Sequence, residues 1–173
     1  DEVMAHFEKG DYIVLQNEIN ELAYIMEKAH EKGLVTVLNP SPMNEKISTL
    51  PLDTVNYFLL NEVEASQILG KETTGDETWE VIAGQLLERF PHASIVLTMG
   101  SEGSVFKNHE ETVIQPIYKV QAVDTTAAGD TFTGYFIGGI LSGLSAKEAM
   151  DQAAKASAIA VTRRGAAPSI PVL

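Results

Sequence analysis

Residues 55–64 read Val-Asn-Tyr-Phe-Leu-Leu-Asn-Glu-Val-Glu, and the change of pattern within them indicates the class of fold. The run Val55–Leu60 is apolar except for Asn56 and has the composition of a strand. Asn61 follows at once and is a favoured N-cap residue, so we expect a helix over Glu62–Leu69 that ends at Gly70. A strand that passes directly into a capped helix is the repeating unit of an α/β protein.

The same alternation extends in both directions along the chain. We expect further strands over Tyr12–Leu15, Leu34–Leu38 and Ser94–Thr98, and the apolar run Tyr12–Leu15 predicts a strand buried on both faces. Helical spacing of apolar residues predicts helices over Ile19–Gly33 and Thr78–Phe90. Strands that alternate with helices of about 10 to 15 residues indicate βαβ units, and therefore a mostly parallel sheet.

The pattern changes after Thr98. Two short apolar segments flank the polar residues 107–111, which predicts a hairpin at a sheet edge. The remaining expected elements are an extended run and two helices, at Tyr118–Val123, about Ala128–Ser142 and Ala146–Thr162. The predicted fold is therefore one α/β domain over residues 1–173, doubly wound, with a mostly parallel sheet, helices on both faces and an antiparallel edge.

Composition excludes several classes of function. The chain has 12 basic and 24 acidic residues, and a net charge of −12 argues against a nucleic-acid binder or a binder of anionic membranes, since both need a basic face. The absence of cysteine excludes disulfides, thiolate metal sites and a cysteine nucleophile. Because no apolar run approaches about 18 residues and no signal peptide is recognisable, we expect a cytoplasmic protein.

One segment combines the features of an anion site with a carboxylate. Residues 124–132 read Asp-Thr-Thr-Ala-Ala-Gly-Asp-Thr-Phe, where Ala127, Ala128 and Gly129 allow a ligand close to the backbone. If a helix begins there, its first amides lack internal partners and attract anions. Asp130 would lie in the same turn, which suits transfer of a negatively charged group to a hydroxyl. The alternative is structural, since Asp in a first helical turn complements the dipole and small residues favour close packing.

Two familiar phosphate-binding signatures are absent. The sequence contains neither G-x-x-x-x-G-K-[ST] nor G-x-G-x-x-G. Any nucleotide must therefore be held in another way.

The segment 124–130 resembles D-T-x-[GA]-A-G-D, the signature of the ribokinase-like (PfkB) carbohydrate kinases. Ala127 is the variant typical of the family's ribose-specific members. Four other segments resemble family motifs in the same order, namely Leu15–Ile19 (Q-x-E-[IS]), Leu38–Pro42 (L-N-P-A-P), Asn61–Glu64 (N-x-x-E) and Thr162–Pro171 (T-R-x-G-A-x-x-S-[IV]-P). The resemblance runs over essentially the whole chain.

The resemblance implies ATP-dependent phosphorylation of a sugar hydroxymethyl group, with D-ribose giving ribose 5-phosphate as the favoured reaction. Asp130 would be the general base. The amides of Ala127, Ala128 and Gly129 would form the anion hole for the phosphoryl group. Fructose or adenosine as substrate, or a non-catalytic nucleotide-binding fragment, are the alternatives.

The resemblance also implies binding residues. Asn61 and Glu64 would hold the Mg²⁺–phosphate end of ATP, with Glu64 acting on Mg²⁺ through water. The nucleotide cleft would be lined by Thr98, Gly100 and Gly103, and Glu18 and Asp124 would contact sugar hydroxyls. A K⁺ loop would comprise Asp124, Thr126, Ala160, Arg163, Gly165 and Ser169. For Asn61 and Glu64 the structural alternative is a helix cap with a solvated acid.

Members of the family are longer than this chain, and the resemblance covers only their C-terminal portion. The sugar-covering lid, which is also the usual homodimer contact, has no counterpart in this sequence. We therefore expect a kinase fold truncated at its N-terminus. The 173-residue chain should retain the nucleotide half and turn over poorly by itself.

Overall fold

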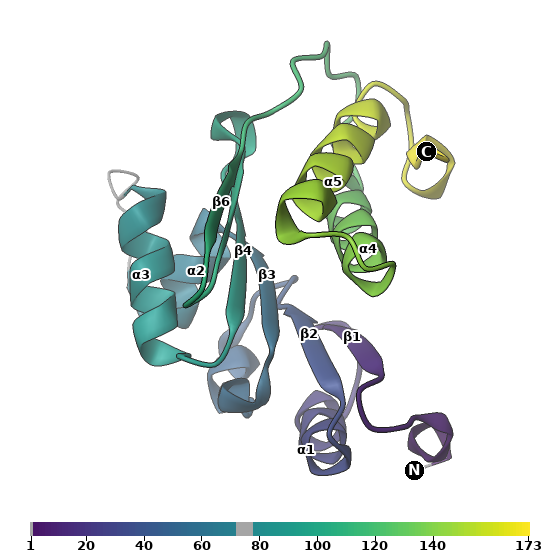
Figure 1. Ribbon diagram of the computed structural model, residues 1–173. Coiled ribbons are helices and arrows are strands. Elements are labelled where there is room, and N and C mark those ends of the chain that lie inside the picture. The colour runs from purple at the N-terminus through teal and green to yellow at the C-terminus, as the bar shows by residue number, and fades with distance from the viewer. Residues whose placement is uncertain (1, 72–77) are drawn as a thin grey trace. The chain divides into compact units, whose positions relative to one another are not determined.

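A computed structural model describes residues 2–71 and 78–173 of the protein (Figure 1). Its strands are β1 (Tyr12–Gln16), β2 (Val35–Asn39), β3 (Tyr57–Asn61), β4 (Ser94–Thr98), β5 (Ser104–Lys107) and β6 (Thr112–Gln115). Its α-helices are α1 (Leu22–Lys32), α2 (Glu62–Ile68), α3 (Trp79–Arg89), α4 (Ala128–Leu141) and α5 (Ala146–Ala160).

The strands form a sheet in the order β1-β2-β3-β4-β5-β6. The first four strands pair in parallel, with Leu15 opposite Leu38 and Phe58 opposite Ile95. Strands β5 and β6 are neighbours joined by a turn closed by the Asn108 amide on the Glu111 carbonyl (3.1 Å), and so short a connection requires an antiparallel hairpin. The α/β class, the mostly parallel sheet with flanking helices and the antiparallel edge are therefore confirmed.

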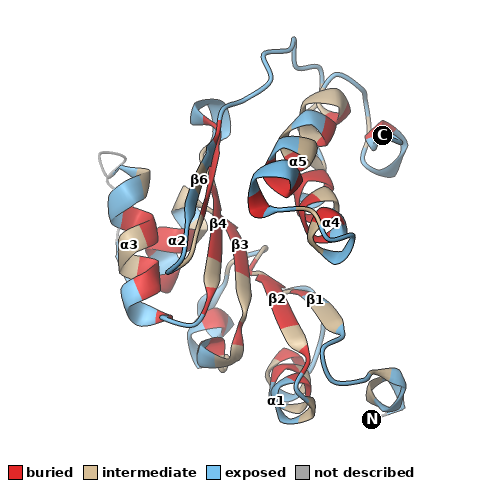
Figure 2. Ribbon diagram, in the orientation of Figure 1, coloured by how far each residue is buried: buried red, intermediate tan, exposed pale blue. Residues whose placement is uncertain are grey.

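The chain divides into two compact units, residues 1–98 with 107–111, and residues 99–106 with 112–173. In the first unit the middle residues of β2, β3 and β4 are buried, as Figure 2 shows. The rings of Phe58 and Phe90 lie 4.7 Å apart between their centroids. The buried middle residues of these strands are apolar with the exception of Thr36, as expected for strands covered on both faces.

The second unit is organised around α4 and α5, which run alongside one another (Figure 1). They pack closely because Gly139 has no side chain, and a Cβ there would lie 3.1 Å from the Ala149 Cβ. The Ser157 hydroxyl of α5 donates to the Ala128 carbonyl of α4 (3.0 Å). Helix α5 therefore fixes the first turn of α4, where the sequence places the candidate chemistry.

Three expectations differ from the structure. The strand expected to be buried on both faces is β1, but it lies at the edge of the sheet and its Val14 is 49% exposed. The helix expected from Ile19 begins at Leu22, because Glu21 has a left-handed backbone and Asn17 ties the preceding turn to Ser41 (3.0 Å). The extended run Tyr118–Val123 forms no strand, and its large side chains are exposed, so no sheet neighbour stabilises it. Within the described ranges, no helix is both long enough and apolar enough to cross a lipid bilayer.

Candidate functional site

The carboxyl ends of the parallel strands meet at one edge of the first unit. Gln16 pairs with Asn39, and Asn61 pairs with Thr98. Because Leu38 pairs with Phe58, β3 and β4 extend two residues beyond β1 and β2. Ligands of open α/β sheets bind outside this edge. Glu18 follows β1 in an exposed turn at the same edge.

Asn61 and Glu64 form a capping box at the start of α2. The Asn61 side-chain oxygen accepts the Glu64 amide (2.9 Å), and the Glu64 carboxylate accepts the Asn61 amide (3.0 Å). Glu64 is half-buried, and this burial raises its pKa, with a smaller raising effect from the charge of Glu62. Asn61 and Glu64 thus cap α2, as the structural alternative predicted. A role of these two residues toward a phosphate would come in addition to capping.

Thr98 and Gly100 flank the end of β4, and Gly103 closes the turn that leads into β5. The amide of Met99 donates to the Gly103 carbonyl (2.9 Å). Gly103 has φ +104° and is buried, and a Cβ there would lie 2.4 Å from the Gln115 carbonyl oxygen. Gly103 is therefore required by the close approach of β6, whereas Gly100 is exposed with open space around it.

Asp124 ties two loops of the second unit together. Its carboxylate accepts the amide of Thr126 (2.9 Å) and the amide of Gly165 (2.9 Å). The hydroxyl of Thr126, followed by these two amides, lowers the pKa of Asp124 to about 2, and the charge of Arg164 adds to the effect. Asp124 is therefore ionised at neutral pH and holds the entry to α4 in place.

The turn that starts α4 has an unusual backbone. Ala127 adopts a left-handed conformation with φ +60°, which is uncommon for a residue with a Cβ. Its carbonyl accepts the Thr131 amide (2.9 Å), the first hydrogen bond of the helix. Non-glycine residues in this region cost free energy and cluster at functional sites.

The three amides expected to be unpartnered differ from one another. The Ala128 amide donates to the Thr125 carbonyl (3.2 Å), because the left-handed residue beside it closes a turn. Among the described residues, the amides of Ala127 and Gly129 have no acceptor in the protein. The expectation of free amides therefore applies to two of the three positions.

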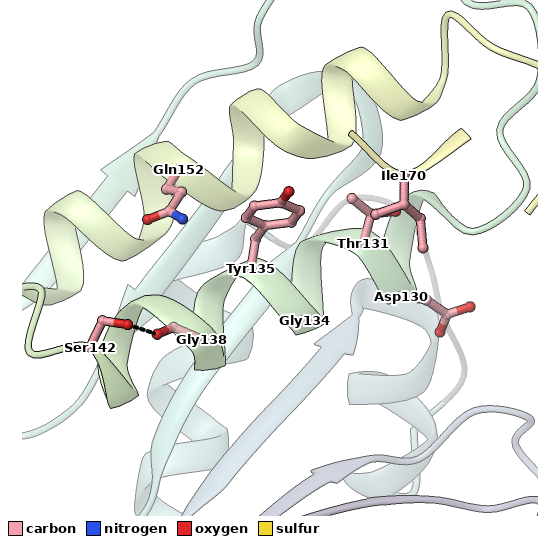
Figure 3. Close-up of a pocket in the computed structure, with 8 residues that line it drawn as sticks. All are labelled: Asp130, Thr131, Gly134, Tyr135, Gly138, Ser142, Gln152 and Ile170. Carbon is pink, nitrogen blue, oxygen red and sulfur yellow. Dashed lines mark hydrogen bonds between the residues drawn. The ribbon is translucent and has the colours of Figure 1, made fainter. Parts of the chain in front are cut away.

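Asp130 lies on the exposed side of the first turn of α4 and lines a hollow of about 370 Å³ (Figure 3). The hollow extends along α4 past Gly134 and Gly138 to Ser142, with Gln152 of α5 and Ile170 of the C-terminal segment beside it. The carboxylate of Asp130 is thus accessible to a small molecule, as a general base must be.

The residues expected in a cation loop lie around the end of α5. The Ala160 carbonyl accepts the Arg163 amide (3.0 Å), and the Ser169 carbonyl accepts the Arg163 guanidinium (3.3 Å). Ser169 is fully buried and its hydroxyl donates to Ala166 (2.7 Å). The described residues contain no cluster of three His, Cys, Asp or Glu side chains suited to a metal ion.

The structure therefore forms two partial sites. The first unit brings together Asn61, Glu64 and Thr98 at one sheet edge, which Glu18 adjoins. The second unit joins the entry of α4 to the end of α5 through Asp124 and Gly165, and holds the amides of residues 127–129 beside Asp130.

Sequence reasoning missed the main-chain acceptors that hold the second partial site. The Val161 carbonyl accepts the amides of Val123 (2.8 Å) and Asp124 (3.1 Å), and Ser157 secures Ala128 from α5. A carbonyl is present at every residue, so no sequence signal could have singled out Val161. Ser157 is a polar residue within an alanine-rich helix, which is a weak signal that could have been used.

Comparison with known proteins identifies the family. The model of the pfkB family carbohydrate kinases matches residues 6–173. The chain belongs to this family. The resemblance carried by the five sequence motifs is thereby confirmed.

The relatives of this pfkB-family chain include ribokinases. It is 36% identical over 171 residues to the Schizosaccharomyces pombe ribokinase, covering 93% of this chain and 52% of that protein. For the Staphylococcus aureus ribokinase the identity is 34% over 167 residues, with 95% and 54% covered. The structure of the Arabidopsis thaliana ribokinase complexed with ribose and ATP matches with a TM-score of 0.81 at 31% identity, covering 92% of this chain and 52% of that one. The chain spans about half the length of the curated relatives it matches.

Proposed function

We propose that this chain carries the base and the nucleotide-binding half of a kinase that phosphorylates D-ribose with ATP to give ribose 5-phosphate. The observation that supports it most is the first turn of α4, where left-handed Ala127 and accessible Asp130 lie next to two amides without acceptors. Ribokinases among the relatives support ribose as the sugar.

Asp130 is the general base of the proposed reaction. Its carboxylate accepts the proton of the sugar hydroxymethyl group as the oxygen attacks the γ-phosphorus of ATP. The new bond is O–P, the bond that breaks joins the γ-phosphorus to the bridging oxygen, and ADP leaves. A positioned general base raises the rate by a factor of about 10²–10⁴, and we assign this factor to Asp130.

The amides at residues 127–129 stabilise the phosphoryl group during transfer. The amides of Ala127 and Gly129 are available, and the Ala128 amide can share its long bond to Thr125 with an anion. The positive end of the α4 dipole adds to the attraction. Phosphoryl transfer depends mainly on such positioning and electrostatic stabilisation.

The nucleotide is held at the strand ends and at the turn after β4. Thr98, Gly100 and Gly103 are the proposed nucleotide contacts, and Asn61 and Glu64 are proposed to act toward the Mg²⁺–phosphate end. The donors fit, because outside the two capping bonds Asn61 has its side-chain NH₂ and Glu64 has its second carboxylate oxygen. Mg²⁺ keeps several of its waters and needs few carboxylates, and when bound it neutralises phosphate charge.

A monovalent cation such as K⁺ fits the loops that Asp124 joins. The candidate ligands are oxygens of Asp124 and Thr126 and main-chain carbonyls of Ala160, Arg163, Gly165 and Ser169. The low pKa of Asp124 keeps one negative charge there. A bound cation would supply positive charge to the loop that enters α4.

Glu18 and Asp124 are the proposed contacts to sugar hydroxyls, since each carboxylate accepts several hydrogen bonds.

The test uses this chain joined to the portion of the S. pombe ribokinase that it does not match, referred to below as the fused kinase. ADP release is measured with ribose, fructose and adenosine. We expect ribose to be preferred and Asp130→Asn to lower kcat by about 10²–10⁴ with little change in KM for ATP. The matched control is Asp151→Asn, an exposed acid of α5 that should leave kcat unchanged.

Three results would contradict the proposal. A loss below tenfold in Asp130→Asn excludes Asp130 as the base. ATP binding without phosphorylation of any of the three acceptors supports the non-catalytic alternative. Equal activity in K⁺ and Na⁺ argues against the cation loop.

A further inference from the structure

We propose that Ser157 of α5 is a positioning residue, because the hydrogen bond from its hydroxyl to the Ala128 carbonyl aims the Gly129 amide at the phosphoryl group. The inference rests on the proposed function, since it concerns the proposed anion hole at the start of α4. Ser157 acts through the main chain of α4 and does not itself touch the substrate. Both helices belong to the second unit of the chain.

The Ala128 carbonyl and the Gly129 amide are the two ends of one peptide group. This group is planar and trans, so its N–H points away from its C=O. A partner that fixes the direction of the carbonyl therefore fixes the direction of the amide as well. The hydroxyl of Ser157 is such a partner, at 3.0 Å from the carbonyl oxygen.

The amide end of this peptide group is open to a ligand. Gly129 is exposed, and a Cβ placed on it would meet no atom within 4 Å. Among the described residues, the Gly129 amide has no acceptor in the protein, whereas the Ala128 amide already donates to Thr125 (3.2 Å). A bond that served only to join two helices would not require an open donor on the same peptide group.

Helix α5 places a short hydroxyl where only a short one fits. Three of its residues near Ser157 are fully buried, namely Ala153, Ala156 and Ala160. Alanine side chains let two helix backbones approach closely, so the serine hydroxyl can reach the main chain of α4. A longer polar side chain would force the helices apart.

The bond from Ser157 adds to what the helix itself provides. Within an α-helix the Ala128 carbonyl also accepts the amide four residues further on, and its second lone pair is available to Ser157. Two hydrogen bonds to one carbonyl restrict the peptide group more narrowly than one. They also polarise it, which makes the Gly129 N–H a stronger donor.

The first test follows the Gly129 amide resonance of the 173-residue chain by NMR during titration with inorganic phosphate. We expect the resonance to shift as phosphate binds, and we expect Ser157→Ala to weaken this binding by at least about threefold. The variant keeps α5 folded because alanine is the best helix former. The matched control is Ser142→Ala, which removes a hydroxyl bond to the Gly138 carbonyl (2.8 Å) at the other end of α4. It should leave the titration unchanged.

The second test measures ribose-dependent ADP release by the fused kinase. Loss of one anion-hole donor costs about 10²–10³ in kcat, and a donor that is present but poorly aimed should cost about tenfold. We therefore expect Ser157→Ala to lower kcat about tenfold and to change KM for ATP by less than about twofold. This split between kcat and KM separates positioning from a general loss of structure. Ser142→Ala should change neither constant.

The contrary outcomes separate this inference from the proposed function. Equal phosphate affinity in wild type and Ser157→Ala, or an unchanged kcat where Asp130→Asn is impaired, overturns the positioning role and leaves the proposed function standing. Equal losses in Ser142→Ala and Ser157→Ala also overturn the positioning role, because they would reflect general loosening of α4. If phosphate does not shift the Gly129 resonance even in the wild type, the anion hole is absent, and the proposed function fails together with the inference.

Discussion

At the scale of single residues, the left-handed backbone of Ala127 is the feature that sets the direction in which α4 begins. Its sequence signal is weak, because alanine has no preference for this conformation and many residues of a helix start are small. Glycine would adopt the same φ without steric cost. The conformation is therefore imposed by the surrounding hydrogen bonds, among them the bonds of Asp124 to Thr126 and Gly165.

We expect Ala127→Gly to leave the free energy of unfolding unchanged or to raise it slightly, and Ala127→Val to lower it by at least about 1–2 kcal/mol. The reason is the φ of +60°, at which the Cβ of a branched residue is crowded. Urea unfolding of the 173-residue chain measures both. Equal stability of the two variants would show that the left-handed turn is not maintained in solution.

Asp124 makes stability depend on pH in a predictable direction. Its pKa in the folded protein is about 2, below the ordinary value of 3.8, so its ionised form stabilises the fold. The contribution is complete above about pH 4 and disappears as the pH falls toward 2. We expect the Tm difference between wild type and Asp124→Asn to be constant from pH 5 to 7 and to shrink between about pH 4 and 2.

The control for Asp124 is Asp53→Asn, which changes an exposed acid in a short 3-10 helix of the first unit. It should show little change in Tm at neutral pH. A Tm difference for Asp124→Asn that persists unchanged at pH 2 would contradict the charge-based origin of the effect. It would indicate instead that the loop is disrupted because the asparagine NH₂ cannot accept a backbone amide as a carboxylate oxygen does.

At the scale of elements, two capping boxes of the same type allow structure and function to be separated. Asn61 and Glu64 cap α2, and Ser145 and Glu148 cap α5. We expect Asn61→Ala and Ser145→Ala each to cost about 1 kcal/mol of stability. Only Asn61→Ala should also weaken binding of Mg²⁺–ATP, by about tenfold or more.

Urea unfolding and calorimetric titration with Mg²⁺–ATP measure the two effects on the same samples. If both variants lose stability and neither loses affinity, Asn61 is a cap and nothing more. If Ser145→Ala also loses affinity, the loss reflects general loosening of the protein.

The elements themselves were largely predictable from sequence because their signals are local. The apolar runs at β1 to β4, the Asn61 cap and the terminal glycine of α1 each act within a few residues, and the structure confirms them. The start of α1 was predicted three residues early, since the bond from the Asn17 amide to Ser41 is not local. Tyr118–Val123 has strand composition but no strand neighbour, and pairing is not encoded in composition.

The candidate site was predictable to a different degree. Residue types singled out Asp130 and the small residues before it as candidates, because a carboxylate next to Ala-Ala-Gly is a recognisable pattern. The role of Gly103 as a packing requirement against Gln115 emerged only from the structure. The same holds for the bond that occupies the Ala128 amide, since turn closure depends on the φ of its neighbour.

At the scale of the whole molecule, charge and chemistry are distributed unequally along the chain. Residues 1–111 hold 20 acidic and 7 basic residues, whereas residues 112–173 hold 4 and 5. The proposed anion hole thus lies in the nearly neutral region, where a polyanionic nucleotide meets the least repulsion. The proposed Mg²⁺-proximal pair lies in the acidic region, which suits a cation.

The length of the chain leads to the last prediction. The 173 residues span about half of the relatives, so the chain alone should bind Mg²⁺–ATP but hold the sugar poorly. Losing the orientation of one reactant can remove a factor of about 10⁵ or more in effective concentration. We therefore expect ribose-dependent ADP release by the chain alone to be at least about 10³-fold slower than by the fused kinase.

The Asp130→Asn variant tests whether slow turnover comes from poor sugar positioning, since a general base has little effect without a positioned hydroxyl. The substitution should cost about 10²–10⁴ in the fused kinase and less than about threefold in the chain alone. Activity of the chain alone that equals that of the fused kinase, and that is abolished by Asp130→Asn, would show that these residues already form a complete sugar site.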